Sequence, residues 1–419
     1  MSSLQPVRGT HDLLPEEMRR HRRVIETARE IAERHGYLQM VTPVFEFTEV
    51  FKRTLGETTD VVTKEMYTFA PTERDGSAMQ SITLRPEATA GICRALISNG
   101  LQQDLPLRFF YHGPMFRHER PQKGRQRQFH QIDVELFGVA EPAGDVEVIA
   151  CGQMILEALG VADRTTLELN TLGDPESRTA YRQALVDYFG AHRATLSEES
   201  RDRLERNPLR ILDSKDEGDR RLVKDAPEFS AYLTPAAKEF FAKVRQGLED
   251  LGIAYTLNPR LVRGLDYYCH TAFEFTTEAL GAQGTVLGGG RYDYLVETMG
   301  GPHTPGVGWA AGIERLAMLL TAAPPAPKPL VLVPIGEAAQ RRAQKIAQDL
   351  RRQGFTIELG YAGNVKKRMS RANKLAAPVA VLFGDDELAK GEAQVKDLAS
   401  GEQHAVRLDD LAHALRRFA

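Results

Sequence analysis

Residues 106–138, PLRFFYHGPMFRHERPQKGRQRQFHQIDVELFG, predict the structural centre of the first part of this chain. Before the turn, Leu107, Phe109 and Tyr111 occupy every second position, as in a β-strand. Residues 121–124, Pro-Gln-Lys-Gly, are typical of a turn. After the turn, period two places five side chains on one strand face: Phe129, Gln131, Asp133, Glu135 and Phe137. We therefore expect a β-hairpin.

The connecting loop of this hairpin is rich in arginine. It has one acid, Glu119, and five basic residues: Arg117, Arg120, Lys123, Arg125 and Arg127. A solvated hairpin tip is the ordinary interpretation of such a loop. Arginine, however, grips phosphate oxygens with a planar fork, whereas a merely solubilising loop has no reason to prefer it to lysine. Polar Gln131 and Glu135 also share their strand face with phenylalanines, so the pattern favours a phosphate or nucleotide site.

The sequence around the hairpin predicts an α+β domain. A helix is expected over residues 15–36, because proline and two glutamates stand at its start and glycine at its end. Its apolar stripe is expected to contain Leu14, Met18, Ile25, Ala28 and Ala32. The strands that follow lack a regular alternation with helices, which favours an antiparallel sheet.

The rest of the chain divides by composition. Residues 174–251 are highly charged and helical in pattern, and indicate an insertion into the first domain. Residues 323–329 are rich in proline and predict an extended linker. Beyond it, apolar strands alternate with helices, which predicts a small parallel-type α/β domain. The expected division is a catalytic domain in two parts, 1–173 and 252–322, the insertion, the linker and a C-terminal domain over 330–419.

Composition excludes several classes of protein. The 419 residues are 42% apolar and 26% charged, close to an ordinary soluble enzyme, and no apolar run is long enough to cross a bilayer. Three widely spaced cysteines provide neither a disulfide framework nor a Cys-x-x-Cys zinc site. We expect a protein of the reducing cytoplasm without a membrane partner. The net charge of −3 argues weakly against a nucleic-acid partner.

Three further motifs are candidates for a ligand site: residues 261–275, LVRGLDYYCHTAFEF; residues 288–293, GGGRYD; and residues 306–316, GVGWAAGIERL. The third has its last glycine one position too late for a dinucleotide fingerprint and is not part of a βαβ unit. It suits a strand and helix packed closely beneath a ligand. No phosphate-binding Gly-x-x-x-x-Gly-Lys-Ser/Thr occurs, so nucleotide binding would depend on arginine.

Two weaker patterns are set aside. Residues 368–371 faintly resemble the lysine loop of class I aminoacyl-tRNA synthetases, but the expected His-x-Gly-His partner is absent. His112, His118 and His130 have no metal-ligand spacing and are interpreted as ordinary polar residues. No metal ligand is assigned.

Taken in order, these motifs resemble the histidyl-tRNA synthetases, a class II aminoacyl-tRNA synthetase family. Residues 116–121, FRHERP, resemble class II motif 2, residues 306–316 resemble motif 3, and residues 36–45 occupy the place of motif 1. Residues 261–268 and 288–293 resemble two elements peculiar to the histidine enzymes, and residues 7–12 resemble the family's opening. The resemblance covers essentially the whole chain, including an anticodon-binding-type C-terminal domain.

The resemblance implies ATP-dependent activation of L-histidine and transfer of the histidyl group to tRNA(His) by a homodimer, with Mg²⁺ accompanying ATP. It assigns catalysis to Arg117 and Arg263, and ATP binding to Arg117, Arg125 and Arg315. It assigns histidine binding to Glu87, Thr89, Gln131, Glu135, Arg263, Tyr267 and Tyr268. It assigns tRNA contacts to Gln122, Arg127, Lys366, Lys367 and Arg371, although the basic run that contains the last three would look the same as a solvated helix face.

One position departs from the family pattern: Tyr294 stands where glycine is usual, which puts a turn beside the pocket in question. An alternative function is that of the non-catalytic regulatory relatives from histidine biosynthesis, which bind histidine without charging tRNA. Those relatives depart at the arginines and lack the C-terminal domain, whereas this chain has Arg117, Arg263, Arg315 and residues 330–419. Another class II synthetase with the same type of C-terminal domain is disfavoured by Glu135 and by residues 263–268.

Overall fold

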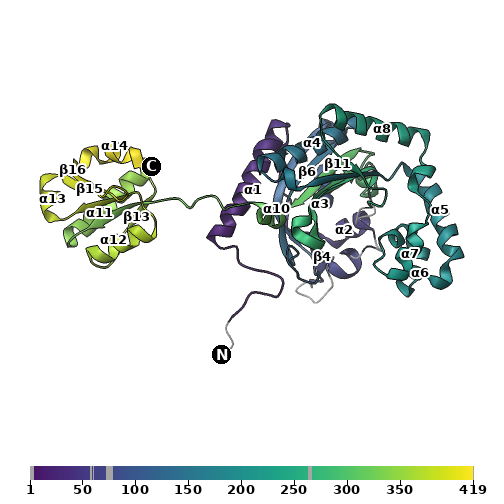
Figure 1. The fold of residues 1–419 in the computed structure, drawn as a ribbon, viewed down its shortest axis with the longest axis horizontal. Helices are drawn as coiled ribbons and strands as arrows, with labels where there is room; N and C mark the ends of the chain where they lie inside the picture. Colours follow the sequence, from purple (N-terminus) through teal and green to yellow (C-terminus); the bar gives the residue numbers. More distant parts are fainter. Residues whose placement is uncertain (1–3, 57–58, 60, 72–78, 263–266, 419) are drawn as a thin grey trace. The chain divides into compact units, whose positions relative to one another are not determined.

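A computed structural model describes all residues of the chain except 1–3, 57–58, 60, 72–78, 263–266 and 419. The predicted hairpin lies inside the larger of its two main sheets (Figure 1). Its strands are β5 (Leu107–Phe116) and β6 (Gln128–Phe137), paired from Leu107 opposite Phe137 to Phe116 opposite Gln128. Ten consecutive pairs hold the arginine-rich loop at one end of the hairpin.

The eight-stranded sheet has the order β1-β5-β6-β11-β10-β9-β7-β8. Its other strands are β1 (Leu38–Gln39), β11 (Gly306–Gly312), β10 (Thr285–Arg291), β9 (Cys269–Thr276), β7 (Thr166–Thr171) and β8 (Thr256–Leu257). Pairing is antiparallel from β5 through β7, and parallel only where the short β1 and β8 join the two edges. The predicted antiparallel α+β fold is confirmed.

One face of this sheet is covered by helices. These are α1 (Pro15–Arg34), α4 (Pro142–Ala158) and α10 (Ile313–Leu319), and α8 (Pro235–Asp250) packs on α4. Alternate residues of β6, including Ile132 and Val134, enter the core with these helices. The intervening residues of β6 therefore face the opposite side of the sheet.

The buried stripe of α1 differs in part from the prediction. Leu14 and Met18 are 63% and 43% exposed, whereas Ala28 and Ala32 are buried. The stripe begins instead at His21, whose polar ring was not counted as a candidate for burial. A histidine on the buried face of a helix is unusual.

A smaller layer packs against the large sheet. It contains a three-stranded sheet in the order β2-β4-β3, formed by β2 (Phe45–Phe47), β4 (Ile82–Leu84) and β3 (Tyr67–Phe69). The π-helical turn Val61–Glu65 and three α-helices pack with it: α2 (Thr48–Leu55), α3 (Thr89–Ser98) and α9 (Leu295–Thr298).

Residues 175–250 are helical. The α-helices are α5 (Pro175–Ala191), α6 (Glu198–Arg206), α7 (Glu217–Lys224) and α8. Each α-helix has a side-chain N-cap, provided in order by Asp174, Ser197, Asp216 and Thr234, and such caps satisfy backbone donors at helix starts. A separate apolar cluster that includes Tyr181, Phe189 and Phe229 holds the segment together.

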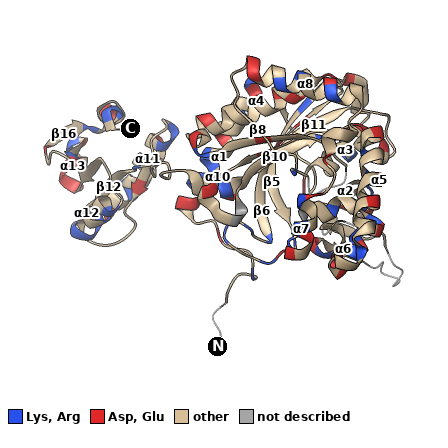
Figure 2. Ribbon diagram, turned by 45° about the vertical axis from the view of Figure 1, so that its right-hand side comes forward, with Lys and Arg blue, Asp and Glu red and all other residues tan. Residues whose placement is uncertain are grey.

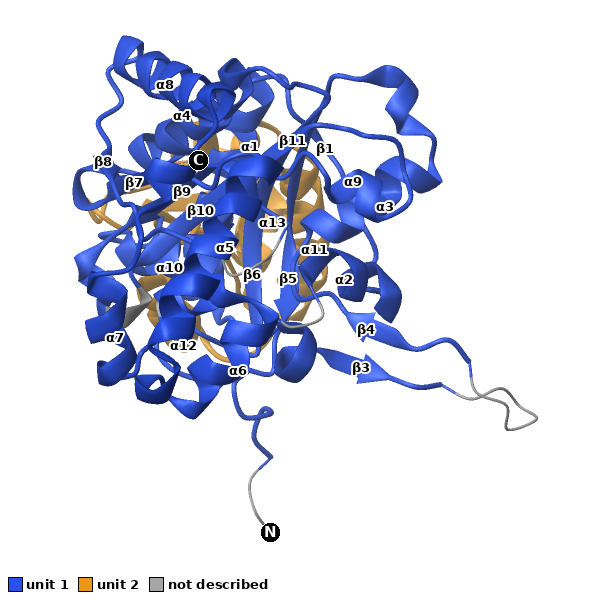
Figure 3. Cartoon of the chain, turned by 90° about the vertical axis from the view of Figure 1, so that its right-hand side faces the viewer, with its two compact units in different colours: residues 1–324 blue, residues 325–419 orange. Residues whose placement is uncertain are grey.

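The chain divides into two compact units, 1–324 and 325–419 (Figure 3). The second unit has a sheet in the order β13-β12-β14-β15-β16. Its strands are β12 (Leu330–Pro334), β13 (Ile357–Leu359), β14 (Val379–Phe383), β15 (Glu392–Asp397) and β16 (Gln403–Arg407), and its α-helices are α11 (Glu337–Arg352), α12 (Val365–Lys374), α13 (Asp385–Lys390) and α14 (Leu411–Leu415).

Only β13, β12 and β14 are parallel, while β15 and β16 form an antiparallel hairpin. The expectation of a parallel-type sheet is thus incomplete, because the polar hairpin lacks the apolar runs that mark the other strands. None of the helices within the described residues is long and apolar enough to cross a membrane.

Candidate active site

A cavity of about 340 Å³ opens on the face of the large sheet that α1 does not cover. All four sequence motifs contribute to its lining, represented by Arg117, Gln131, Tyr268, Gly288 and Arg315. Segments that are about 200 residues apart in the chain therefore meet because β6, β11, β10 and β9 are consecutive neighbours in the sheet.

Three arginines gather at one end of the cavity. Arg117 follows β5; its Nε donates to the carbonyl of Pro86 (2.8 Å), and its guanidinium lies 5.2 Å from the ring centroid of Phe129. Arg125 lies in the loop, with Nε 2.5 Å from Glu119 Oε2. The loop thus folds back on itself through Glu119 and keeps both arginines at the cavity.

The third arginine of this group, Arg315, comes from α10 and not from the hairpin. Its guanidinium donates to the carbonyls of Gly124 (3.1 Å) and Thr285 (2.6 Å), so it connects the arginine-rich loop to β10. Burial lowers the pKa of Arg315, and the nearby positive charges of Arg125 and Arg117 act in the same direction. An anion with several charges would relieve this repulsion, which makes the arginine end a suitable place for a polyphosphate.

Carboxylates and polar groups also line the cavity, some of them close to Arg117. Buried Glu87 accepts from the backbone N–H groups of Thr89 (2.8 Å) and Ala90 (2.9 Å) and so caps α3. Burial raises the pKa of Glu87. On β6, Oε1 of Gln131 is buried and has no hydrogen-bond partner among the described residues. This part of the cavity lining therefore has unused hydrogen-bonding capacity and acidic character.

Glu135 lies next to the cavity but does not line it. Its carboxylate accepts hydrogen bonds from the hydroxyls of Thr89 (2.6 Å to Oε1) and Tyr292, both of which do line the cavity. Burial raises the pKa of Glu135 to about 8. A Cβ on Gly308 would lie 1.8 Å from Glu135 Oε2, so only glycine leaves room for this carboxyl group.

Tyr267 and Tyr268 both line the cavity, with ring centroids 4.6 Å apart. Arg178 of α5 donates to the carbonyl of Tyr268 (2.8 Å), which ties the helical segment to the cavity wall. Burial raises the pKa of Tyr267 well above the ordinary value. Arg263, four residues before Tyr267, lies outside the described residues.

Asp133 was not assigned a role from the sequence. It lines the cavity between Gln131 and Glu135, is 1% exposed, and has a buried Oδ2 without a hydrogen-bond partner among the described residues. Burial raises its pKa well above the ordinary value, and the carboxylates of Glu135 and Glu87 add to this effect. Asp133 lies on the same strand face as Gln131 at period two, and this pattern in the sequence could have indicated that it lines the cavity.

Other predicted contacts lie away from the cavity. Gln122 pairs with Arg125 through the backbone. Arg127 donates to the carbonyls of Glu119 and Arg8, both at 3.3 Å, and so fastens the N-terminal segment to the hairpin. Tyr294 is 39% exposed, packs on His303 and does not line the cavity.

The remaining predicted residues, Lys366, Lys367 and Arg371, are exposed on α12 of the second unit. Figure 2 shows blue, the colour of lysine and arginine, on this helix. Arg371 forms an ion pair with Glu358 (2.9 Å). Arg368 differs from them, because it donates to Gln340 and to the carbonyl of Pro334 within the unit. The residues of the basic run therefore differ in their contacts: Lys366 and Lys367 are open to solvent, whereas Arg368 and Arg371 have partners within the unit.

The family of the chain follows from comparison with known sequences. A family profile described as Histidyl-tRNA synthetase matches residues 9–316, and a second profile, Anticodon binding domain, matches residues 330–418. The chain belongs to the histidyl-tRNA synthetase family. The resemblance recognised in the sequence is therefore confirmed.

Individual relatives agree with this membership. The chain is 59% identical to the histidine–tRNA ligase of Rhodospirillum rubrum, with all of both chains covered. It is 60% identical to that of Gluconacetobacter diazotrophicus, over 98% of this chain and 97% of the relative. Among solved structures, the apo histidyl-tRNA synthetase of S. aureus matches with a TM-score of 0.82 and 33% identity, over 98% of this chain and 99% of the other.

Proposed function

We propose that this protein is a class II histidine–tRNA ligase, which activates L-histidine with ATP and transfers the histidyl group to tRNA(His). The observation that carries the proposal is a single cavity lined by Arg117, Arg125 and Arg315 together with Glu87, Gln131 and Asp133. A polyanion and an amino acid can occupy such a cavity side by side. Membership of a family of such enzymes supports the assignment.

In the first step, the carboxylate of histidine attacks the α-phosphate of ATP and pyrophosphate leaves. Negative charge on the phosphate oxygens rises in the transition state, so cations held in place beforehand accelerate the step. Arg117 is held by Pro86 and Phe129, which suits the α-phosphate, and Arg125 and Arg315 suit the distal phosphates. The proposed role of Arg263 rests on the resemblance alone.

The acidic part of the lining would bind the amino acid. Glu87, Asp133 and the free Oε1 of Gln131 provide acceptors for the α-ammonium group, and Thr89 lies beside them. Tyr267 and Tyr268 would enclose the imidazole. Glu135 would recognise the ring after small movements of Thr89 or Tyr292, because both hydroxyls now occupy its oxygens.

Mg²⁺ would enter with ATP. This ion prefers oxygen ligands and commonly uses one or two carboxylates together with substrate phosphates. Glu119 and Glu274 line the arginine end of the cavity, and both charges act on Arg315. The donor set fits: Glu119 and Glu274 would hold the ion, which would neutralise phosphate charge.

The transfer step requires tRNA contacts on both units. Gln122 and Arg127 lie in the hairpin loop, where they would contact the acceptor end. In the second unit, Lys366, Lys367 and Arg371 would contact backbone phosphates near the anticodon. We propose the domain division 1–173, 174–251, 252–322, 323–329 and 330–419 for these roles.

Homodimer formation is supported by exposed apolar side chains in the motif 1 region. Leu38, Val41, Phe45 and Phe47 are 69%, 70%, 52% and 51% exposed, and a concentration of such residues is characteristic of an interaction surface. Light scattering is expected to give twice the chain mass, and Val41→Asp to shift it toward the monomer. We place the enzyme in the cytoplasm, where its three free, buried cysteines stay reduced.

The decisive experiment is pyrophosphate exchange into ATP with each of the twenty amino acids. Exchange that depends on histidine alone is expected. A folded protein that binds histidine without exchange would instead indicate the regulatory function, which the C-terminal domain and the 59% identity to a ligase disfavour.

A further inference from the structure

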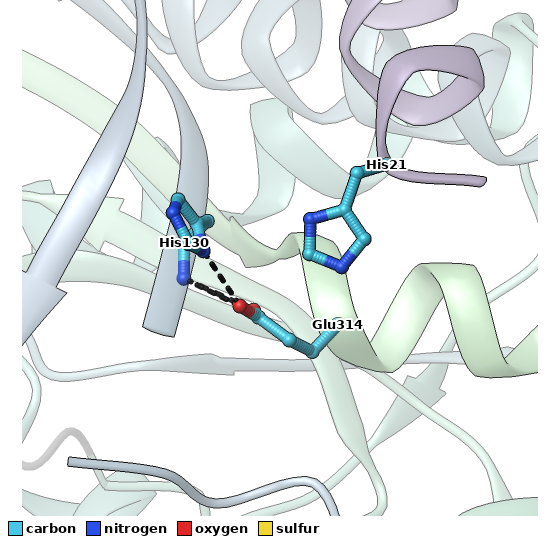
Figure 4. A group of neighbouring side chains, drawn as sticks. All are labelled: His21, His130 and Glu314. Carbon is cyan, nitrogen blue, oxygen red and sulfur yellow. Dashed lines mark hydrogen bonds and ion pairs between the residues drawn. The ribbon is translucent and has the colours of Figure 1, made fainter. Parts of the chain in front are cut away.

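A second group of functional side chains lies beside the active-site cavity, and one of its members, Glu314, also lines that cavity. His21 of α1, His130 of β6 and Glu314 of α10 point toward one another (Figure 4), and one potential ligand atom from each lies within 4.8 Å of the others. His130 Nδ1 is 2.8 Å from Glu314 Oε1, and the two histidine rings stand nearly perpendicular with centroids 5.7 Å apart. Three separate elements thus meet at a cluster that none of their sequences indicated.

The ion pair between His130 and Glu314 does not account for His21. The His21 side chain is 4% exposed, and its ring nitrogens form no hydrogen bond within the described part of the chain. They are not among the fully buried atoms, and the side chain lines an adjoining cavity, so a ligand from solvent can reach them.

We propose that His21, His130 and Glu314 bind one zinc ion. Imidazole and carboxylate are ordinary zinc ligands, with bonds of about 2.0–2.2 Å and tetrahedral geometry. Two imidazoles on one such ion have ring centroids roughly 5 Å apart, close to the 5.7 Å observed. Tetrahedral ligand atoms lie roughly 3.4 Å apart, so a pair at the limit of 4.8 Å has to close by about 1.4 Å, within reach of side-chain rotation.

An entry path and a fourth ligand are available. A cavity of about 490 Å³ adjoins the cluster and is lined by His21 and Glu314 together with His11, Glu17, Arg20 and Lys123. Three protein ligands leave one position for water or for His11. Arg20 and Lys123 oppose a cation, so we expect a binding site of moderate affinity rather than a permanently filled one. Bound zinc would fasten α1 and β6 to the start of α10, one residue before Arg315.

Zinc binding is measured directly, without substrates, so its result is independent of the proposed enzymatic function. Full-length protein freed of metal with a chelator is titrated with Zn²⁺ alone by calorimetry, and with Mg²⁺ for comparison. We expect one zinc ion per chain, no comparable magnesium binding, and a higher melting temperature with zinc. Replacement of bound zinc by Co²⁺ should give the visible absorption of a tetrahedral site.

Two variants test the ligands. His21→Phe retains an aromatic ring and Glu314→Gln retains the side-chain shape; both should weaken zinc binding by at least about a hundredfold, since even outer-shell changes cost about 10–100-fold. His303→Gln is the matched control, because His303 faces Glu297 at 3.4 Å in an exposed pair without a second histidine. Circular dichroism verifies folding, and if one variant is unfolded the other decides. Absence of zinc uptake by wild-type protein, or equal uptake by wild type and the folded variants, overturns the proposal.

Discussion

The hydroxyl of Thr89 donates a hydrogen bond of 2.6 Å to Oε1 of Glu135. This bond joins the first residue of α3 to the C-terminal half of β6, and the two residues are 46 positions apart in the chain. Both groups are buried, so loss of the threonine hydroxyl leaves Oε1 of Glu135 without this donor. The bond therefore fixes the position of the start of α3, which contains Thr89, relative to strand β6 of the hairpin.

Thr89→Val removes this donor while retaining the side-chain shape. A buried acceptor left without its partner costs about 1–3 kcal/mol, so we expect a loss of that size in the free energy of unfolding, measured by denaturant titration. KM for histidine should rise more than KM for ATP. Thr179→Val is the control, because Thr179 forms an exposed bond to its own helix; an equal loss in both variants would contradict the role of the Thr89 bond.

The raised pKa of Glu135 predicts a dependence of stability on pH. In the folded protein its pKa is about 8, above the ordinary value of 4.5, so the folded state holds a proton that the unfolded state releases. The stabilisation is complete below pH 4.5 and is lost as pH rises through about 8. The free energy of unfolding of wild-type protein should therefore fall relative to that of Glu135→Gln between these pH values. Parallel curves for the two proteins would contradict the assignment.

Asp133→Asn tests the residue that the sequence left without a role. If the buried carboxylate binds the α-ammonium group, its loss removes a hydrogen bond to a charged group, worth about 1.5–3 kcal/mol, and KM for histidine should rise by about 10–100-fold. KM for ATP should stay close to that of the wild type. A purely structural role would instead lower stability and change both constants together.

Arg117→Ala should lower the rate of histidine-dependent pyrophosphate exchange by at least about a hundredfold, as for other preorganised transition-state donors. Arg117→Lys should restore little, because lysine lacks the bidentate fork. Arg120→Ala is the control, since Arg120 is exposed in the same loop and does not line the cavity. A near-wild-type rate for Arg117→Ala would exclude it from catalysis.

The sequence predicted those features of the site that follow local rules. Period two along β6 placed Gln131 and Glu135 on one face, and the excess of arginine over lysine marked the loop. The sequence did not predict side chains whose role depends on contacts with residues far away in the chain. In the sequence, His21 is a single polar residue in a helix, and only the fold brings β6 and α10 beside it. The spacing of His112, His118 and His130 along the chain gave no indication that His130 belongs to this cluster. Likewise, β15 and β16 lack the apolar runs that mark the other strands of the second unit, so the sequence did not indicate this strand pair.

The last prediction concerns the second unit. Lys366→Ala combined with Lys367→Ala removes two exposed positive charges from α12. If these lysines contact tRNA phosphates, KM for tRNA should rise and the dependence of tRNA binding on salt should weaken, while exchange without tRNA remains unchanged. Arg341→Ala combined with Arg342→Ala removes the same charge from exposed positions on α11 of the same unit. If both pairs raise KM equally, the effect is one of net charge, and α12 is not a specific contact surface.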